Sequence, residues 1–192
     1  TWVSGAKVRV GPSADPGDLY NQVYETQSGH AYDFPAGITQ TLGIPFRGRP
    51  WFLLSEQERA RGASLVASLV AGSHPPIGVF VGGHDAKQLS ADVWRDLVAG
   101  LDAQAVPYLV FLGPEEAALE PLLAPLIHAP GALCQPRPLR EFAAMLSQLR
   151  LLITPDSGPM HLAAALDIPV LAMLNIEGSR QFVPRGPDDR AL

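Results

Sequence analysis

The chain has 192 residues, of which 47% are hydrophobic and 17% are charged. This length suits one globular domain, or one domain with part of another, and the apolar fraction argues against intrinsic disorder. The formal net charge is −5 and no basic run is present, which excludes a nucleic-acid footprint and a polybasic membrane patch. Cys134 is the single cysteine, so an internal disulfide is excluded, and no apolar run reaches the ~20 residues of a membrane span.

The first 54 residues are dense in turn-forming residues. Only residues 7–10 alternate as a short strand does, and Gly and Pro recur in the sequence that follows. A long irregular run of this kind is unusual inside a compact domain. We therefore expect residues 1–54 to be the remnant of an N-terminal domain with its linker, and residues 55–192 to form a separate domain.

A regular pattern begins at Ser55, which with Glu58 matches a capping box at the start of a helix. Helix-like segments then alternate with short apolar runs at 77–81, 107–112, 132–134, 151–154 and 168–174. Apolar strands without alternation are typical of a parallel sheet that is covered on both faces. The predicted fold class is therefore α/β, a doubly wound, Rossmann-like parallel sheet. In such a sheet, ligands bind at the carboxyl ends of the strands.

The loop 154–161 is the strongest candidate site. It leads from a strand through a turn at Asp156, Ser157 and Gly158 into a helix whose first amide N–H groups form a ready phosphate site. Gly158 lets the backbone approach a ligand, Ser157 adds a hydroxyl donor, and His161 stands in the first helical turn. An equally good interpretation is that Asp156 or Ser157 only caps the helix and that His161 is a surface residue.

Two other loops follow predicted strands. Gly82 and Gly83 precede Lys87, whose charge is able to neutralise a diphosphate, although a solvated lysine is the commoner case. A glutamate of the loop 113–116 is able to accept hydrogen bonds from ribose hydroxyls. Ordinary electrostatics at a helix start explains the same glutamates without a ligand.

Other chemistries lack their motifs. The sequence has no G-x-S-x-G elbow, no Walker A loop and no G-x-G-x-x-G, which argues against a serine hydrolase, a P-loop NTPase and a nicotinamide dehydrogenase. Its five histidines lack zinc-ligand spacing, so we expect no metal site.

Taken together, the three loops resemble a known family. Residues 153–170 are similar to the D-[ST]-G-x-x-H-[LI]-A-A-A signature of glycosyltransferase family 9, the ADP-heptose:lipopolysaccharide heptosyltransferases and their relatives. Residues 87–94 resemble the family's K-x-[WL]-[PS]-x-x-x-W stretch, and residues 113–116 its G-[GP]-x-E loop. The resemblance covers about residues 75–185. It departs from the family at Gly82 and Gly83, where threonines are usual, and in the loop that begins at Asn175.

The resemblance implies the GT-B fold, in which two Rossmann-like domains face each other across a cleft and the C-terminal one holds the donor. It assigns the phosphates to Lys87, the nucleotide ribose to Glu116, and the diphosphate and donor sugar to residues in 156–161. The complete set of implied donor-binding residues is Gly82, Gly83, Lys87, Glu116, Asp156, Ser157, Gly158 and His161. The implied reaction is inverting and needs no metal or other cofactor.

The implied partners are a nucleotide-diphosphate sugar similar to ADP-heptose and a glycan or lipid-linked acceptor of the cell envelope. The implied location is the cytoplasm, at the inner membrane, with peripheral association through the N-terminal domain. The family's catalytic base, an aspartate of that domain, has no counterpart among residues 1–54. We therefore expect a fragment that supplies the donor-binding half. Two alternatives stay open: a non-catalytic nucleotide-binding module and a GT-B-fold sugar-nucleotide epimerase.

Overall fold

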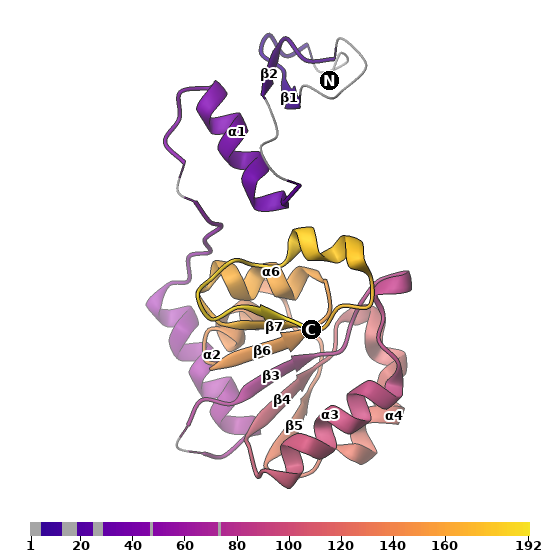
Figure 1. Cartoon of the computed structure of the whole chain (residues 1–192). Helices are drawn as coiled ribbons and strands as arrows, with labels where there is room; N and C mark the ends of the chain where they lie inside the picture. The colour runs from indigo at the N-terminus through magenta and orange to yellow at the C-terminus, as the bar shows by residue number, and fades with distance from the viewer. Residues whose placement is uncertain (1–4, 13–18, 25–28, 47, 73) are drawn as a thin grey trace. The chain divides into compact units, whose positions relative to one another are not determined.

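The chain folds into two units, Thr1–Pro50 and Trp51–Leu192, which are described separately below (Figure 1). The computed structural model describes residues 5–12, 19–24, 29–46, 48–72 and 74–192. Among these residues, no helix is both long and apolar enough to cross a bilayer.

The first unit holds a parallel pair of short strands and one helix: β1 (Val10–Pro12), β2 (Gln22–Tyr24) and α1 (Phe34–Thr41). Asn21 joins the strands, because its Oδ1 accepts from the backbone N–H of Arg9 and its Nδ2 donates to the carbonyl of Lys7. The sequence predicts a strand at residues 7–10, whereas in the structure β1 begins at Val10. The helix α1 was not predicted. It begins next to Pro35, a residue that suits the first helical turn.

The second unit is built on a parallel six-stranded sheet in the order β5-β4-β3-β6-β7-β8. In chain order, the strands are β3 (Ile77–Phe80), β4 (Tyr108–Phe111), β5 (Gly131–Cys134), β6 (Leu151–Thr154), β7 (Val170–Ala172) and β8 (Arg190–Ala191). This order places the first strand, β3, beside the fourth, β6, which is the arrangement of dinucleotide-binding folds. The predicted doubly wound α/β fold is thus confirmed, and its switch point lies between β3 and β6.

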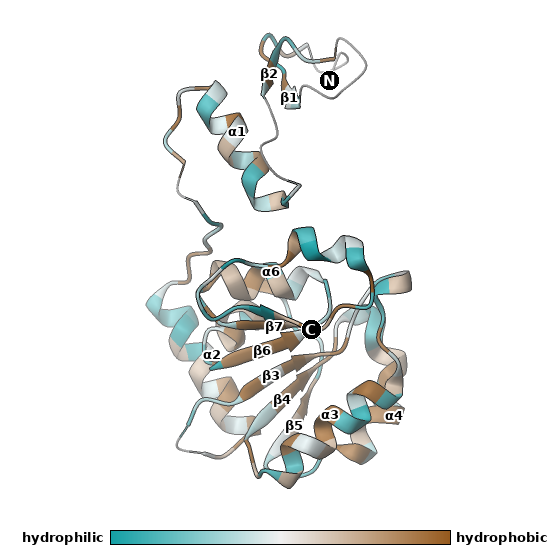
Figure 2. Ribbon diagram, in the orientation of Figure 1, coloured by the Kyte–Doolittle hydropathy of each residue, from teal (hydrophilic) through white to brown (hydrophobic). Residues whose placement is uncertain are grey.

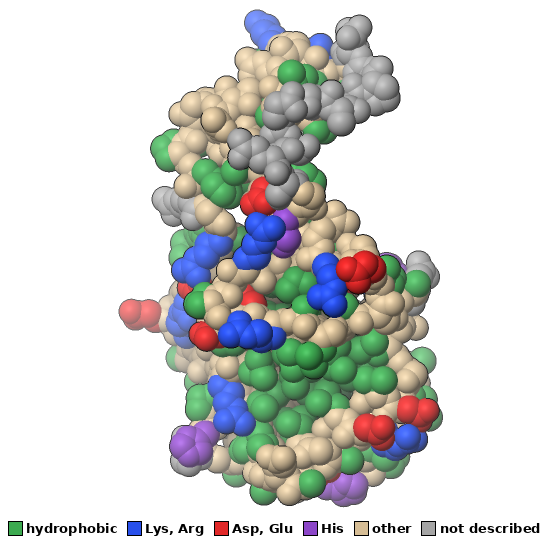
Figure 3. Space-filling view, viewed as in Figure 1, with side chains coloured by type: hydrophobic (Ala, Val, Ile, Leu, Met, Phe, Trp, Pro, Cys, Tyr) green, Lys and Arg blue, Asp and Glu red, His purple; other side chains and the backbone are tan. Residues whose placement is uncertain are grey.

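Hydrophobic strands explain why the sheet is central. β3 and β4 are buried throughout, and Figure 2 shows the middle of the sheet in the colours of hydrophobic residues. On one face, Trp94 and Val98 pack against Val79, Tyr108 and Val110. The other face holds the larger core cluster, to which the helices on that side contribute. Hydrophobic side chains also gather on the face of this unit that Figure 3 presents. Two positions in the sheet, Leu151 and Leu171, are only partly buried.

Helices connect the strands and cover the sheet (Figure 1). Their bounds are α2 (Glu56–Leu69), α3 (Ala91–Ala103), α4 (Glu120–Leu123), α5 (Leu139–Leu146) and α6 (Gly158–Ala165). The predicted capping box of α2 is present, since Ser55 N donates to Glu58 Oε2 at 2.8 Å and Glu58 N donates to Ser55 Oγ at 3.2 Å. The helix α6 begins at Gly158, with Pro159 in its first turn, where proline is favoured.

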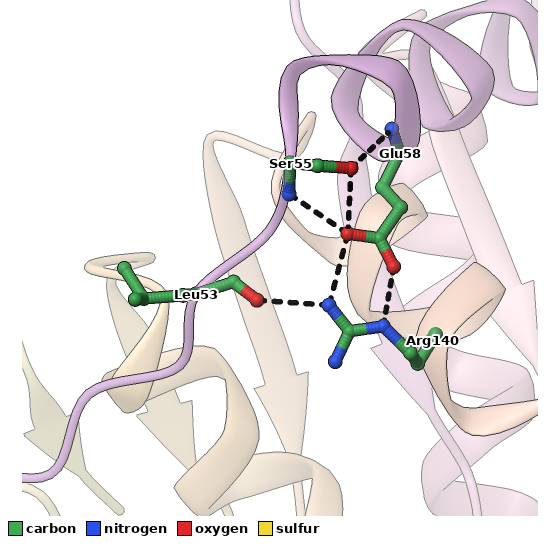
Figure 4. Close-up of polar contacts among 4 residues, drawn as sticks. All are labelled: Leu53, Ser55, Glu58 and Arg140. Carbon is green, nitrogen blue, oxygen red and sulfur yellow. Dashed lines mark hydrogen bonds and ion pairs between the residues drawn. The ribbon is translucent and has the colours of Figure 1, made fainter.

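Arg140, in α5, ties its helix to the start of α2 (Figure 4). Its guanidinium donates to both carboxylate oxygens of Glu58 and also to the carbonyl of Leu53. These hydrogen bonds, with those from Ser55, lower the pKa of Glu58 to about 2. The two helix backbones approach closely because residue 62 is glycine: a Cβ there would lie 2.2 Å from the carbonyl oxygen of Ala144.

Candidate functional site

A pocket of about 750 Å³ lies at the carboxyl ends of the central strands. Its volume falls in the usual range for small-molecule sites, roughly 300–1,000 Å³. Loops after four strands contribute to it, and so does the beginning of α6. Its polar and charged lining residues are His84, Lys87, Glu115, Glu116, Gln135, Arg137, Asp156, Ser157 and His161. Three loops that the sequence singled out therefore meet in one cavity.

An ion pair closes the switch-point end of this pocket. Lys87, the last residue of the 3-10 helix η3 (Asp85–Lys87), places its Nζ 2.7 Å from Oδ2 of Asp156. The Asp156 side chain is only 6% exposed, and Ser179 Oγ donates to the same oxygen at 2.7 Å. The buried carboxylate is thus both paired and hydrogen-bonded, which is the condition under which a charge is stable in an interior.

The N-terminus of α6 lies next to this pair. Its N-cap residue, Ser157, makes no side-chain capping bond; its hydroxyl is instead 2.9 Å from Oγ1 of Thr154. Gly158 faces open space, because an added Cβ there would meet no atom within 4 Å. The positive end of the helix dipole and the Lys87 ammonium thus share one end of the cavity, an arrangement that favours an anion.

His161 is half-buried in the same pocket. Burial is the main cause that lowers its pKa, and the Lys87 ammonium lowers it further. The Asp156 carboxylate acts in the opposite direction without cancelling these effects. The lowered pKa favours the neutral ring, which can both donate and accept a hydrogen bond.

Glu116 lies in the part of the pocket that follows β4. It belongs to the 3-10 helix η4 (Pro114–Leu119) and is 9% exposed. Two glycines make room for its carboxylate, since a Cβ would lie 2.5 Å from it at Gly82 and 2.3 Å from it at Gly113. Gly83 lines the pocket, whereas Gly82 is buried and does not. In this structure, a Cβ at position 82 would meet both the Glu116 carboxylate, at 2.5 Å, and the Phe80 ring, at 2.6 Å.

Several residues at the site were missed by sequence reasoning. Arg137 lines the pocket beyond β5; its Nη1 is 3.3 Å from Glu141, while its buried Nε has no hydrogen-bond partner among the described residues. Cys134, at the end of β5, also lines the cavity, and burial raises the pKa of its thiol. A signal for both existed, because Cys134 ends a predicted strand and Arg137 follows it, at the edge where ligands bind.

The walls of the pocket between the polar groups are apolar. Phe80, Phe111 and Phe142 line it, and the rings of Phe111 and Phe142 meet edge to face with centroids 5.3 Å apart. The cation and the helix N-terminus suit an anionic part of a ligand. The buried carboxylate suits a hydroxylated part, and the aromatic walls suit a flat one. Among the described residues, no cluster of three or more His, Cys, Asp or Glu suited to hold a metal ion is found.

Comparison with solved structures shows the same fold at low sequence identity. A glycosyl transferase of family 9 from Veillonella parvula matches with 19% identity and a TM-score of 0.78, over 100% of this chain and 58% of its own length. The Escherichia coli ADP-heptose LPS heptosyltransferase II matches with 18% identity and a TM-score of 0.72, over 100% and 63%. The E. coli heptosyltransferase WaaC with ADP matches with 17% identity and a TM-score of 0.63, over 90% and 53%.

The chain thus spans less than two thirds of the length of each of these proteins. No curated protein was found that matches it. The family model of glycosyltransferase family 9 (heptosyltransferase) matches residues 38–184, most of the chain, and it agrees with the signature in the loop 154–161. The chain therefore belongs to glycosyltransferase family 9.

Proposed function

We propose that the Trp51–Leu192 unit binds the nucleoside diphosphate of a sugar donor and serves as the donor-binding half of a glycosyltransferase. One observation carries this proposal. A single pocket at the switch point of the sheet brings together Lys87, the N-terminus of α6 and Glu116. These groups come from three loops that are far apart in the sequence, and each complements a different part of a nucleotide diphosphate.

The phosphates belong at the end that holds Lys87 and Gly158. A lysine ammonium is a compact charge that suits phosphate oxygens, and the helix N-terminus adds backbone donors and a favourable dipole. Asp156 contacts Lys87 rather than a phosphate, because two anions side by side repel each other. We therefore give Asp156 the role of holding the lysine and the turn.

The ribose belongs near Glu116, whose carboxylate accepts hydrogen bonds from a pair of hydroxyls. The base then lies toward the aromatic walls and the loop after β5, where Phe142 and Arg137 line the cavity. Placed in this way, the nucleotide runs along the carboxyl edge of the sheet from β6 toward β5, as ligands of doubly wound folds do.

In the whole protein, the proposed reaction is transfer of a heptose-like sugar, with inversion, to a hydroxyl of a cell-envelope glycan or lipid-linked acceptor on the cytoplasmic side of the membrane. The acceptor oxygen forms a bond to the anomeric carbon as the bond to the diphosphate breaks, and the acceptor hydroxyl loses its proton to a general base. Lys87 and the start of α6 stabilise the charge that develops on the leaving diphosphate. We assign no general base to the described residues.

Calorimetry with ADP, UDP and GDP, each compared with its own nucleoside, tests the donor site. We expect at least one diphosphate to bind more tightly than its nucleoside. In Lys87→Met, that diphosphate should bind about ten- to a hundredfold more weakly, because a charged hydrogen bond contributes roughly 1.5–3 kcal/mol. Lys7→Met is the matched control, since Lys7 is exposed and lies in the other unit. Diphosphates that bind no better than their nucleosides would refute the proposal.

A further inference from the structure

The segment after β7, residues 175–182, contacts the site from outside the pocket. Asn175 donates through its Nδ2 to the carbonyl of Ala86 at 2.5 Å and to that of Gln88 at 3.0 Å. These two carbonyls stand on either side of Lys87 in the sequence. A single side-chain amide therefore holds the backbone from which the Lys87 side chain extends.

Two further residues of the 175–182 segment reach the same lysine by other routes. Ser179 donates to Oδ2 of Asp156, the oxygen that Lys87 Nζ contacts. The Phe182 ring centroid is 5.7 Å from Lys87 Nζ, within the range of a cation–π contact. The segment thus contacts the backbone of the Lys87 loop, the counter-ion of the lysine, and its ammonium group.

We propose that the 175–182 segment fixes Lys87 at the diphosphate end of the pocket and that Asn175 is a positioning residue for donor binding. This inference rests on the proposed function, because it assumes that Lys87 meets a diphosphate. A lysine side chain has a flexible stem of four carbons. Its ammonium is therefore well placed only if the backbone is fixed and rotation about the bonds of the stem is restricted. Order that exists before binding lowers the entropy lost on binding.

The contacts divide this task. Asn175 fixes the backbone on both sides of Lys87, and Asp156 and Phe182 fix the position of its ammonium group. Ser179 holds the buried Asp156 carboxylate through Oδ2, the same oxygen that contacts the Lys87 ammonium. The effect of the segment on a ligand therefore passes through Lys87. It should be large for a ligand with a diphosphate and absent for one without phosphate.

The test uses the full chain with Asn175→Ala, and calorimetry with ADP, or whichever diphosphate binds the wild type, and with the corresponding nucleoside. We expect the diphosphate to bind about three- to tenfold more weakly, as follows from the loss of neutral hydrogen bonds, with unchanged nucleoside affinity. Asn175→Asp should weaken diphosphate binding further than Asn175→Ala, because a carboxylate cannot donate to the two carbonyls and also places negative charge against their oxygens. The control is Gln181→Ala, whose amide donates to Gly178 within the same segment.

A double-mutant cycle separates positioning from a general structural effect. In a Lys87→Met background, Asn175→Ala should change diphosphate affinity by less than twofold, or about 0.4 kcal/mol. The reason is that the effects of two substitutions that act through the same group are not additive. An equal loss for diphosphate and nucleoside, or an undiminished loss in the Lys87→Met background, would overturn the inference and leave the proposed function intact. A wild-type chain that binds the diphosphate no better than the nucleoside would instead refute the proposed function, and the inference with it.

Discussion

At the scale of single residues, His161 offers a direct report on the anion site. In the free protein, burial and the Lys87 ammonium lower its pKa and so favour the neutral ring. A bound diphosphate brings negative charge next to the same ring, and nearby negative charge favours the protonated form. We therefore expect saturation with the nucleoside diphosphate to raise the pKa of His161.

A titration followed by NMR of the histidine ring resonances, with and without ligand, measures this change. His128 serves as a control in the same spectrum, because its ring lies beside Asp102 and outside the pocket. The resonances of its ring should be the same in both samples. An unchanged curve for His161 at saturating ligand would remove this histidine from the anion site.

The positions of site residues could be predicted from sequence where residue type and strand position both carried information. Lys87, Glu116 and the 156–161 loop follow predicted strands, and parallel strands bring their carboxyl ends to one edge. Asn175 had no such signal. Its partners are backbone carbonyls of residues 86 and 88, which look like any others in a sequence. Gly82 shows a related limit, because the space for a Cβ there is taken by the side chains of Glu116, from a different loop, and Phe80.

At the scale of elements, the junction of α2 and α5 predicts a pH dependence of stability. The Arg140 guanidinium, with help from Ser55, lowers the pKa of Glu58 from 4.5 to about 2. A carboxyl group whose folded-state pKa is depressed contributes stability that is fully present above its unfolded value. This contribution should therefore be lost as the pH falls from about 4.5 toward 2.

Thermal melts between pH 2 and pH 6 check this prediction. Glu58→Gln should melt at a lower temperature than the wild type at pH 6, and the difference should shrink as the pH approaches 2. Glu56→Gln, in the same helical turn and exposed, should follow the wild type throughout. A Glu58→Gln difference that stays constant with pH would show that the Arg140 contact does not depend on the charge of Glu58.

Elements with strong local signals were predicted, and elements without such signals, or with misleading ones, were not. The capping box predicted α2, and apolar runs predicted β3, β4 and β6. The strand β8 has two residues and exists because it pairs with β7, so no local pattern could reveal it. The helix α1 was hidden by its own Pro35 and Gly37, which are turn formers in most contexts.

At the scale of the whole molecule, the site and both core clusters belong to one unit. Every residue that lines the pocket, and every described residue of the two clusters, lies between 51 and 192. Residues 51–192 produced alone should therefore unfold in one cooperative transition and bind the nucleoside diphosphate as tightly as the 192-residue chain does. Circular dichroism melts and calorimetry on both proteins make the comparison. Weaker binding by the shorter protein would assign residues 1–50 a part in the site.

The pairing of β3 with β6 has a consequence for how the protein folds. Ile77 pairs with Leu151, whereas the other neighbouring strands of the sheet are much closer in the sequence. Closing so long a loop costs chain entropy and slows folding, so β3, β4 and β5 can come together before β6 joins them. Lys87 and Asp156 meet only after that closure. A partly folded chain in which β6 has not joined the sheet therefore has no anion site. A nucleotide at a hundred times its Kd would stabilise only the fully formed sheet, by about 2.7 kcal/mol.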